Sequence, residues 1–255
     1  MDLELTDRVV IITGGTDGVG LALAERLLQE GAHVTVCGRD QARLENAATR
    51  LGPGALVVRA DVTLASEAED LVAATRERFG RVSGLVNNAG RALAVPVASA
   101  SDEEWREDLE LKVVAAQRLV RLCWEDLCST SGSVVNVLAI SARTPGAGST
   151  PTAASRAAGL ALTKALSREG APHGVRANAV LIGLIESGQW ERRASAAGVD
   201  LEEYYRARAR EDGVPLGRFG RPEEFADLVS FLLSARASYL TGVGVSLDGG
   251  LSPSI

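Results

Sequence analysis

Short apolar runs alternate with longer segments of helical periodicity along most of the chain. The apolar runs are rich in residues that favour buried strands, and they occupy residues 8–12, 33–37, 56–59, 84–87, 133–138, 175–181 and 244–247. Between the first two runs, residues 18–29 place Val19, Leu23 and Leu27 on one face of a helix. Strands that are apolar throughout, with helices between them, form a parallel sheet covered on both faces. The pattern therefore predicts an α/β fold, a doubly wound parallel sheet of about seven strands, in one domain over residues 1–255.

Two segments have weaker patterns. Thr63 is placed to cap a helix that reaches Phe79. Residues 186–221 show no strand pattern, are rich in Arg, Glu and Ala, and contain Trp190 and the pair Tyr204–Tyr205. We expect this segment to be helical. It either forms a lid beside a ligand or consists of surface helices with no part in a site.

The sequence TGGTDGVG at residues 13–20 follows the first predicted strand and opens the first predicted helix. Glycines at this junction let the backbone approach a pyrophosphate, and the helix N-terminus supplies N–H groups and positive charge. The alternative is a glycine turn used only for packing. The motif predicts a dinucleotide site of the Rossmann type, with these candidate residues: Gly14, Thr16, Asp17, Gly18, Val19 and Gly20.

The residues after the second predicted strand bear on which dinucleotide is bound. This strand end faces the adenosine ribose, where a carboxylate favours a free 2′-hydroxyl and an arginine favours a 2′-phosphate. Here Gly38 leaves room and Arg39 brings positive charge, whereas Asp17 adds negative charge nearby. We expect NADP(H) to be favoured over NAD(H).

Further motifs follow in an order that resembles the short-chain dehydrogenase/reductase family over essentially the whole chain. The resemblance implies a Rossmann-fold oxidoreductase. Asp61 and Val62 would meet the adenine, and Gly183 and Ile185 would lie near the nicotinamide, although Ile182 stands where the family usually has Pro. After the fourth predicted strand, the chain carries the family's cofactor-supporting motif, which gives the candidate residues Asn88, Ala89 and Gly90.

The resemblance also shows what is missing. Members that reduce ketones generally use an Asn, a Ser, a Tyr and a Lys, whose positions here hold Lys112, Ala139, Thr152 and Arg156. Ser141 lies two residues beyond the usual Ser position, and no Tyr precedes Tyr204 in the chain. Because a short alcohol is a poor substitute for an acidic phenol, ordinary Tyr-driven reduction is not expected.

The substitutions indicate a different arrangement of charge. Lys112 and Arg156 beside a nicotinamide would form a cationic pocket for a carboxylate, an enolate or a developing alkoxide. Lys112 could also donate the proton, if burial near Arg156 lowers its pKa, and Thr152 could bind substrate through its hydroxyl. The alternatives are that Lys112 forms a salt bridge with Glu110 or Asp108, or packs at a subunit interface. Arg156 would additionally bind the cofactor ribose.

Composition excludes several classes of function. Lys and Arg number 27 against 33 Asp and Glu, and the net charge of −6 argues against nucleic acid as a partner. Three cysteines without a CxxC pair, and an acidic start without a leader pattern, are typical of a cytoplasmic protein. No run is apolar enough for a membrane helix. The two histidines, His33 and His173, stand apart from metal-ligand spacing, so no metal is expected.

Three functions remain open from the sequence. The first is an NADP(H)-dependent oxidoreductase acting on a carbonyl or alcohol of a small organic substrate with a non-standard site. The second is a non-redox lyase, isomerase or dehalogenase on the same fold, and the third is an inactive NADP(H)-binding protein. The family resemblance implies a homo-oligomer, a tetramer or dimer paired through the helices over residues 105–128 and 152–168.

Overall fold

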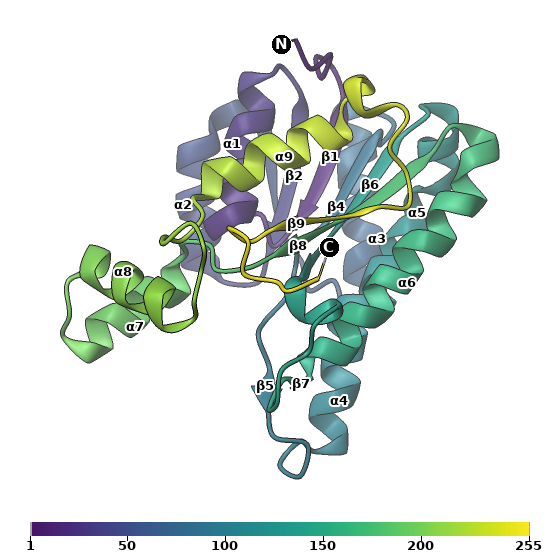
Figure 1. Cartoon of the computed structure of the whole chain (residues 1–255). Coiled ribbons are helices and arrows are strands. Elements are labelled where there is room, and N and C mark those ends of the chain that lie inside the picture. Colours follow the sequence, from purple (N-terminus) through teal and green to yellow (C-terminus); the bar gives the residue numbers. More distant parts are fainter. Residues whose placement is uncertain (1, 255) are drawn as a thin grey trace.

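The computed structural model describes residues 2–254, so both ends of the predicted domain, residues 1 and 255, lie outside the described residues. Its centre is a seven-stranded parallel sheet in the order β3-β2-β1-β4-β6-β8-β9 (Figure 1). The strands are β1 (Val9–Thr13), β2 (His33–Gly38), β3 (Ala55–Arg59), β4 (Gly84–Asn87), β6 (Ser133–Ala139), β8 (Arg176–Ile182) and β9 (Gly244–Leu247). Each agrees with its predicted run to within one residue at either end. The doubly wound fold is thereby confirmed.

Helices cover both faces of the sheet, as Figure 1 shows. One layer contains α1 (Gly18–Gln29), α2 (Gln41–Leu51) and α9 (Pro222–Leu233). The other contains α3 (Ala65–Phe79), α5 (Ala115–Ser129) and α6 (Thr152–Gly170). Short 3₁₀ turns complete the layers at η1 (Gly52–Gly54), η4 (Ala171–His173) and η5 (Ala235–Ala237).

The alternation of side chains along each strand explains the two cores. In β1, Val10 and Ile12 enter the core beneath α1 and α9, whereas Ile11 enters the core beneath α3 and α5. Successive side chains of a strand point to opposite faces, so a strand buried on both faces must be apolar at every position. The continuous apolar runs of the sequence follow from this requirement.

Two projections leave the carboxyl end of the sheet (Figure 1). One contains α4 (Asp102–Leu109) and the antiparallel pair β5 (Ala94–Val95) and β7 (Thr150–Pro151). The other contains α7 (Gly188–Ala197) and α8 (Leu201–Glu211), which confirms that the segment over residues 186–221 is helical. In this second projection Phe219 packs against Trp190 and Tyr205, with ring centroids 5.3 and 4.8 Å away.

One local expectation was wrong. Thr63 does not cap α3, which begins at Ala65 after Leu64; instead, the Thr63 hydroxyl donates to Asp61 Oδ1 at 2.7 Å. The Asp61 carboxylate accepts from the Thr63 amide as well, at 3.0 Å, and so holds Thr63 in a turn before the helix. The expected long helix over residues 105–128 is present as the continuous run of α4, η2 (Glu110–Val114) and α5, of which η2 is π-helical.

Candidate active site

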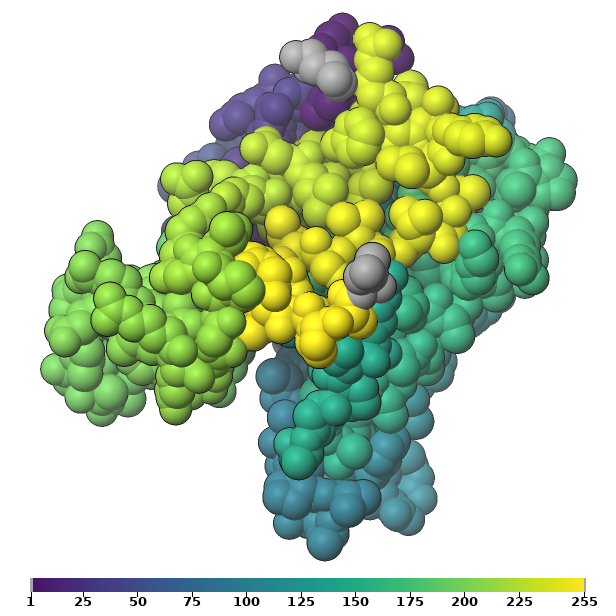
Figure 2. All heavy atoms as spheres, viewed as in Figure 1, coloured from purple at the N-terminus to yellow at the C-terminus, as the bar shows by residue number. Residues whose placement is uncertain are grey.

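A single continuous cavity of about 1290 Å³ lies at the carboxyl ends of the strands. Figure 2 shows the surface hollowed between the α7–α8 projection and the projection that carries α4 and β5. Ligands of open parallel sheets bind at this edge, where neighbouring connections leave in opposite directions. Its volume exceeds that of an ordinary small-molecule pocket, so it has room for a dinucleotide and a second ligand.

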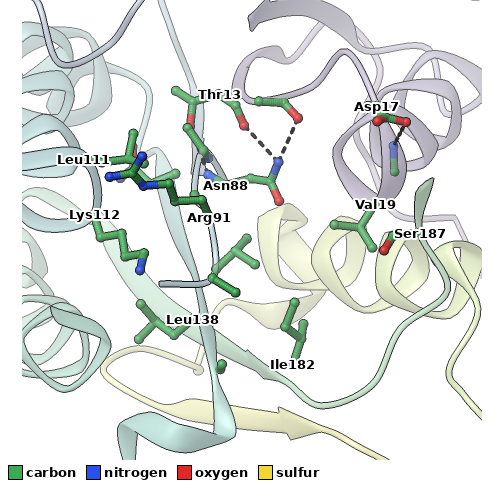
Figure 3. A pocket seen from close by; sticks show the side chains of 18 of the residues that line it. Thr13, Asp17, Val19, Asn88, Arg91, Leu111, Lys112, Leu138, Ile182 and Ser187 are labelled. Atoms are coloured by element: carbon green, nitrogen blue, oxygen red, sulfur yellow. Dashed lines mark hydrogen bonds between the residues drawn. The ribbon is translucent and has the colours of Figure 1, made fainter. Parts of the chain in front are cut away.

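The glycine turn is fastened to the end of β4. Asn88 Nδ2 donates to the carbonyl oxygens of Thr13 at 2.9 Å and Gly14 at 3.0 Å, as Figure 3 shows. Gly14 has a φ of 63°, and a Cβ there would lie 3.1 Å from Ala89 Cα. The positive φ and this close approach to the loop after β4 both favour glycine.

Gly20 has a different place from the one the sequence predicts. It is absent from the cavity lining, and a Cβ on it would lie 2.5 Å from the Gly14 carbonyl oxygen. Its lack of a side chain lets α1 pack against the turn, so it supports the cavity wall without facing a ligand. Gly14, Thr16, Asp17, Gly18 and Val19 do line the cavity.

Asp17 begins α1 and is already paired. Its Oδ1 accepts from the Gly18 amide at 2.8 Å, and its Oδ2 lies 3.3 Å from Arg43 Nη1. The negative charge is thus compensated by the helix N-terminus and by a guanidinium. The Asp17 carboxylate therefore repels the phosphates of NADP(H) less than an unpaired carboxylate would.

Arg39 lies at the mouth of the cavity, at the end of β2. Its Nη1 donates to Asp61 Oδ2 at 2.9 Å, and its side chain is 69% exposed, so its other donors are free for a ligand. Partial burial opposes ionisation of Asp61, but hydrogen bonds from Thr63 and Arg39 lower the pKa of that carboxyl below its ordinary value. Close by, a Cβ on Gly38 would lie 2.6 Å from Thr16 Oγ1, which explains the glycine.

The remaining predicted cofactor residues are spread over three loops that meet at the cavity. They all line it: Val62 after β3, Asn88, Ala89 and Gly90 after β4, and Gly183 and Ile185 after β8. A Cβ on Gly183 would lie 2.7 Å from Asp248 Cβ, so the close approach of two loops requires glycine there.

At the other end of the cavity, four side chains form one buried hydrogen-bonded chain. Lys112 Nζ, in η2, donates to Asp108 Oδ1 and to Thr152 Oγ1, both at 2.6 Å. The second oxygen of Asp108 accepts from Ser155 Oγ at 2.5 Å. Asp108 is fully buried and the Lys112 side chain is 3% exposed. Figure 3 shows the Lys112 ammonium directed toward the cavity.

Of the two salt bridges considered for Lys112, the structure contains the one with Asp108. Lys112 also donates to Thr152, whereas Glu110 pairs with Arg118 at 2.7 Å. Desolvation, with a smaller contribution from the nearby Arg156, lowers the pKa of Lys112 to about 8, although Asp108 opposes the shift. The ammonium is therefore still the main form at neutral pH, with a proton easier to give than that of an exposed lysine.

Arg156 and Ser141 line the same end of the cavity without joining this network. Within residues 2–254, no group accepts a hydrogen bond or forms an ion pair with the Arg156 side chain. Burial lowers the pKa of its guanidinium below the usual range, and the charge of Asp108 partly opposes this. Ser141 lies in η3 (Ile140–Ala142) and makes no hydrogen bond to Lys112 or Thr152.

The sequence interpretation gave Asp108 no part in the site and did not single out Ser155. Their spacing carried a signal, because Asp108 stands four residues before Lys112 and Ser155 three residues after Thr152. In residues 2–254 no group of three or more His, Cys, Asp or Glu side chains is arranged to hold a metal ion. The helices described over that range include none with the length and apolar character of a membrane span.

Comparisons with known proteins agree with this fold. The model of the enoyl-(acyl carrier protein) reductase family matches residues 14–252. The putative ketoacyl reductase 2 of the granaticin polyketide synthase from Streptomyces violaceoruber is 39% identical over 95% of both chains. L-Sorbose reductase from Gluconobacter frateurii, solved with NADPH and L-sorbose, superposes with a TM-score of 0.94 at 32% identity over all of both chains.

A further structural relative is a short-chain oxidoreductase from Pseudomonas aeruginosa PAO1, described as containing an atypical catalytic center. Its apo structure has a TM-score of 0.94 at 37% identity, covering 98% of this chain and 99% of that one. An NADPH-bound structure gives 0.92 at the same identity, covering 98% of each chain. With the family model, the sequence relatives and the fold in agreement, this chain belongs to the short-chain dehydrogenase/reductase family.

Proposed function

We propose that the protein is an NADP(H)-dependent oxidoreductase that reduces a carbonyl group of a small organic substrate, or oxidises the corresponding alcohol. Lys112 and Thr152 replace the phenol of the family as the source of the proton. The observation that carries this proposal is the 2.6 Å contact between Lys112 Nζ and Thr152 Oγ1 at the cavity wall.

The cavity residues fit a phosphorylated dinucleotide. The glycine turn before α1 offers backbone N–H groups to a pyrophosphate, and Arg39 offers free donors to a 2′-phosphate. Two relatives of the same fold were solved with NADPH. When bound, this cofactor supplies or accepts a hydride. The other contacts would come from Asp61 and Val62 at the adenine, Arg156 at the ribose, and Gly183 and Ile185 at the nicotinamide.

The direction of the hydrogen bonds defines how Thr152 would act. A hydroxyl has one hydrogen to donate and two lone pairs to accept with. Because Lys112 donates to Thr152, the Thr152 hydrogen is left to donate to a substrate oxygen. As negative charge develops on that oxygen, Thr152 passes its proton forward and takes one from Lys112. A donor with a pKa of about 8 suits this transfer near neutral pH.

The test separates binding from chemistry. We expect NADPH to bind, as measured by fluorescence titration, and to transfer a hydride from one face of its nicotinamide to a carbonyl substrate. Replacing Lys112 by Met should leave NADPH binding in place and lower the rate of hydride transfer by about 10²–10⁴-fold, the usual effect of losing a general acid. Binding without any transfer would identify an inactive NADP(H)-binding protein. Absence of binding would favour a non-redox activity.

We also infer that the protein assembles as a homotetramer or dimer through α5 and α6. The inference comes from the family, and it is consistent with the exposure of Val114, 41%, at the end of η2 directly before α5. Size-exclusion chromatography with light scattering gives the number of subunits directly, and a monomer would contradict it.

A further inference from the structure

The end of the cavity that holds Lys112 is lined by basic side chains and by no carboxylate. The lining carboxylates are Asp17, Asp40 and Asp61, which lie at the glycine turn and at the ends of β2 and β3. Three basic residues at the Lys112 end come from separate segments: Arg91, Lys112 and Arg156. A ligand that enters this end therefore meets positive charge.

Most of this positive charge is already compensated. Lys112 pairs with Asp108 at 2.6 Å, and Arg91 forms an ion pair with Glu107. Arg156 differs from these, because none of residues 2–254 provides an acceptor for its guanidinium.

The nearest carboxylate that acts on the Arg156 charge is Asp108, which is already paired with Lys112, and a partly buried arginine without an ion pair of its own is costly. A lysine at this position could lose its proton to relieve that cost, but a guanidinium stays charged in proteins. Arg156 also presents five N–H donors in a planar fork. The hydroxyls of a cofactor ribose would accept from some of these donors but would bring no negative charge.

We propose that the substrate is a short oxo acid, or the matching hydroxy acid, whose carboxylate binds the Arg156 fork while its carbonyl oxygen meets Thr152. This inference rests on the proposed function and adds the class of substrate. Thr152 and Arg156 stand one turn apart on α6, so their side chains begin roughly 5–6 Å from each other on one face of the helix. The two side chains therefore leave the helix on the same side, and the long stem of Arg156 lets its fork reach a carboxylate two or three carbons along the chain from a carbonyl bound at Thr152.

The reaction balances with the carboxylate unchanged. In the reduction, a hydride from NADPH adds to the carbonyl carbon and the π electron pair moves to the oxygen. The oxygen takes its proton through Thr152 from Lys112, and NADP⁺ and the hydroxy acid are the products. A neutral ester of the same acid would leave the Arg156 charge uncompensated, so the site should discriminate against it.

The test compares 4-oxopentanoate with its methyl ester, by calorimetric titration into the protein saturated with NADP⁺. We expect the acid to bind at least about tenfold more tightly than the ester, as for a charge-assisted hydrogen-bonded pair. In Arg156→Met this ratio should fall to about one, and in Arg156→Lys, which keeps the charge but loses the fork, it should be partly restored. Thermal unfolding of both variants checks that they fold.

Any of three outcomes would overturn the inference. The ester binds as tightly as the acid or more tightly, the ratio of acid to ester affinity is retained in Arg156→Met, or the acid does not bind at millimolar concentration. Two measurements keep this separate from the proposed function. Hydride transfer from NADPH to the methyl ester without discrimination would support the oxidoreductase and refute the oxo acid. If NADP⁺ does not bind at all, the oxidoreductase proposal fails, and titration of acid and ester into the free protein still tests Arg156.

Discussion

Lys112 Nζ lies 2.6 Å from Thr152 Oγ1, although 40 positions separate the two residues in the chain. One comes from the π-helical segment between α4 and α5, and the other is the first residue of α6. Asp108 links η2 to α6, because its carboxylate accepts from Lys112 and from Ser155. The positions of the family's Asn, Tyr and Lys thus hold an ammonium, an alcohol and a guanidinium that share one end of a cavity.

The hydroxyl of Thr152 is expected to carry the proton. Thr152→Val has nearly the same shape but no hydroxyl, and it should lower the rate of hydride transfer by about 10²-fold or more. Thr152→Ser keeps the hydroxyl and serves as the matched control, with a rate within about tenfold of the original protein. Single-turnover kinetics measures both. Equal rates for the Val and Ser variants would exclude the hydroxyl.

The rate of reduction is expected to depend on the ionisation of Lys112. Desolvation lowers its pKa to about 8, and reduction needs the protonated form. The rate of reduction should therefore fall as pH rises through about 8, and the rate of alcohol oxidation should rise over the same range. Lys112→Met should show neither change near that pH. If the rate in Lys112→Met still changes near the same pH, the titrating group is another residue.

Asp108 is expected to act as a positioning residue that sets the charge of Lys112. Its hydrogen bond and its charge both raise the pKa of Lys112, so removing the charge lowers that pKa further. In Asp108→Asn the fall in the rate of reduction with rising pH should therefore occur at a pH lower by about one unit. Ser155→Ala leaves the Lys112–Asp108 pair intact and should not move it. If the rate of reduction in Asp108→Asn falls at the same pH as in the original protein, the carboxylate only supports the fold.

Arg39 is expected to distinguish the two dinucleotides. Its guanidinium is exposed, and its contact with Asp61 leaves donors for a 2′-phosphate. Arg39→Ala should weaken NADPH binding by about tenfold, because one exposed charge-assisted contact is lost. NADH, which lacks the phosphate, is the internal control and should bind with unchanged affinity. Fluorescence titration with both nucleotides measures the ratio, and equal losses for the two would place Arg39 elsewhere.

Glu224 is expected to stabilise the start of α9 in a pH-dependent manner. Hydrogen bonds from Arg218 and from the Arg221 amide lower the pKa of Glu224 to about 2. Because the folded pKa is below the unfolded one, the stabilisation is present above the unfolded pKa of about 4.3 and is lost as pH falls through about 2. With solvent screening, Glu224→Gln should cost about 0.5–1 kcal/mol of unfolding free energy at neutral pH. Urea denaturation should show this difference at pH 7 and little of it at the lowest pH.

The apolar periodicity of the chain by itself determined the sheet, and the glycine turn between β1 and α1 determined where a dinucleotide would be held. These features are local: burial of a strand on both faces demands apolar residues at each position, and a close backbone approach demands glycine at a fixed spacing. The substituted catalytic positions were also readable, because neighbouring motifs fixed the register of Lys112, Thr152 and Arg156.

Tertiary structure alone decided what those residues contact. Lys112 could have paired with Glu110 or Asp108, and the π-helical turn together with the packing of α6 selected Asp108 and Thr152. Packing of α1 against the glycine turn places Gly20 behind the cavity wall, and the packing of α6 leaves Arg156 without an acceptor among residues 2–254. Periodicity gives the face on which a side chain lies, but the partner it meets depends on how separate helices pack, and no local pattern specifies that.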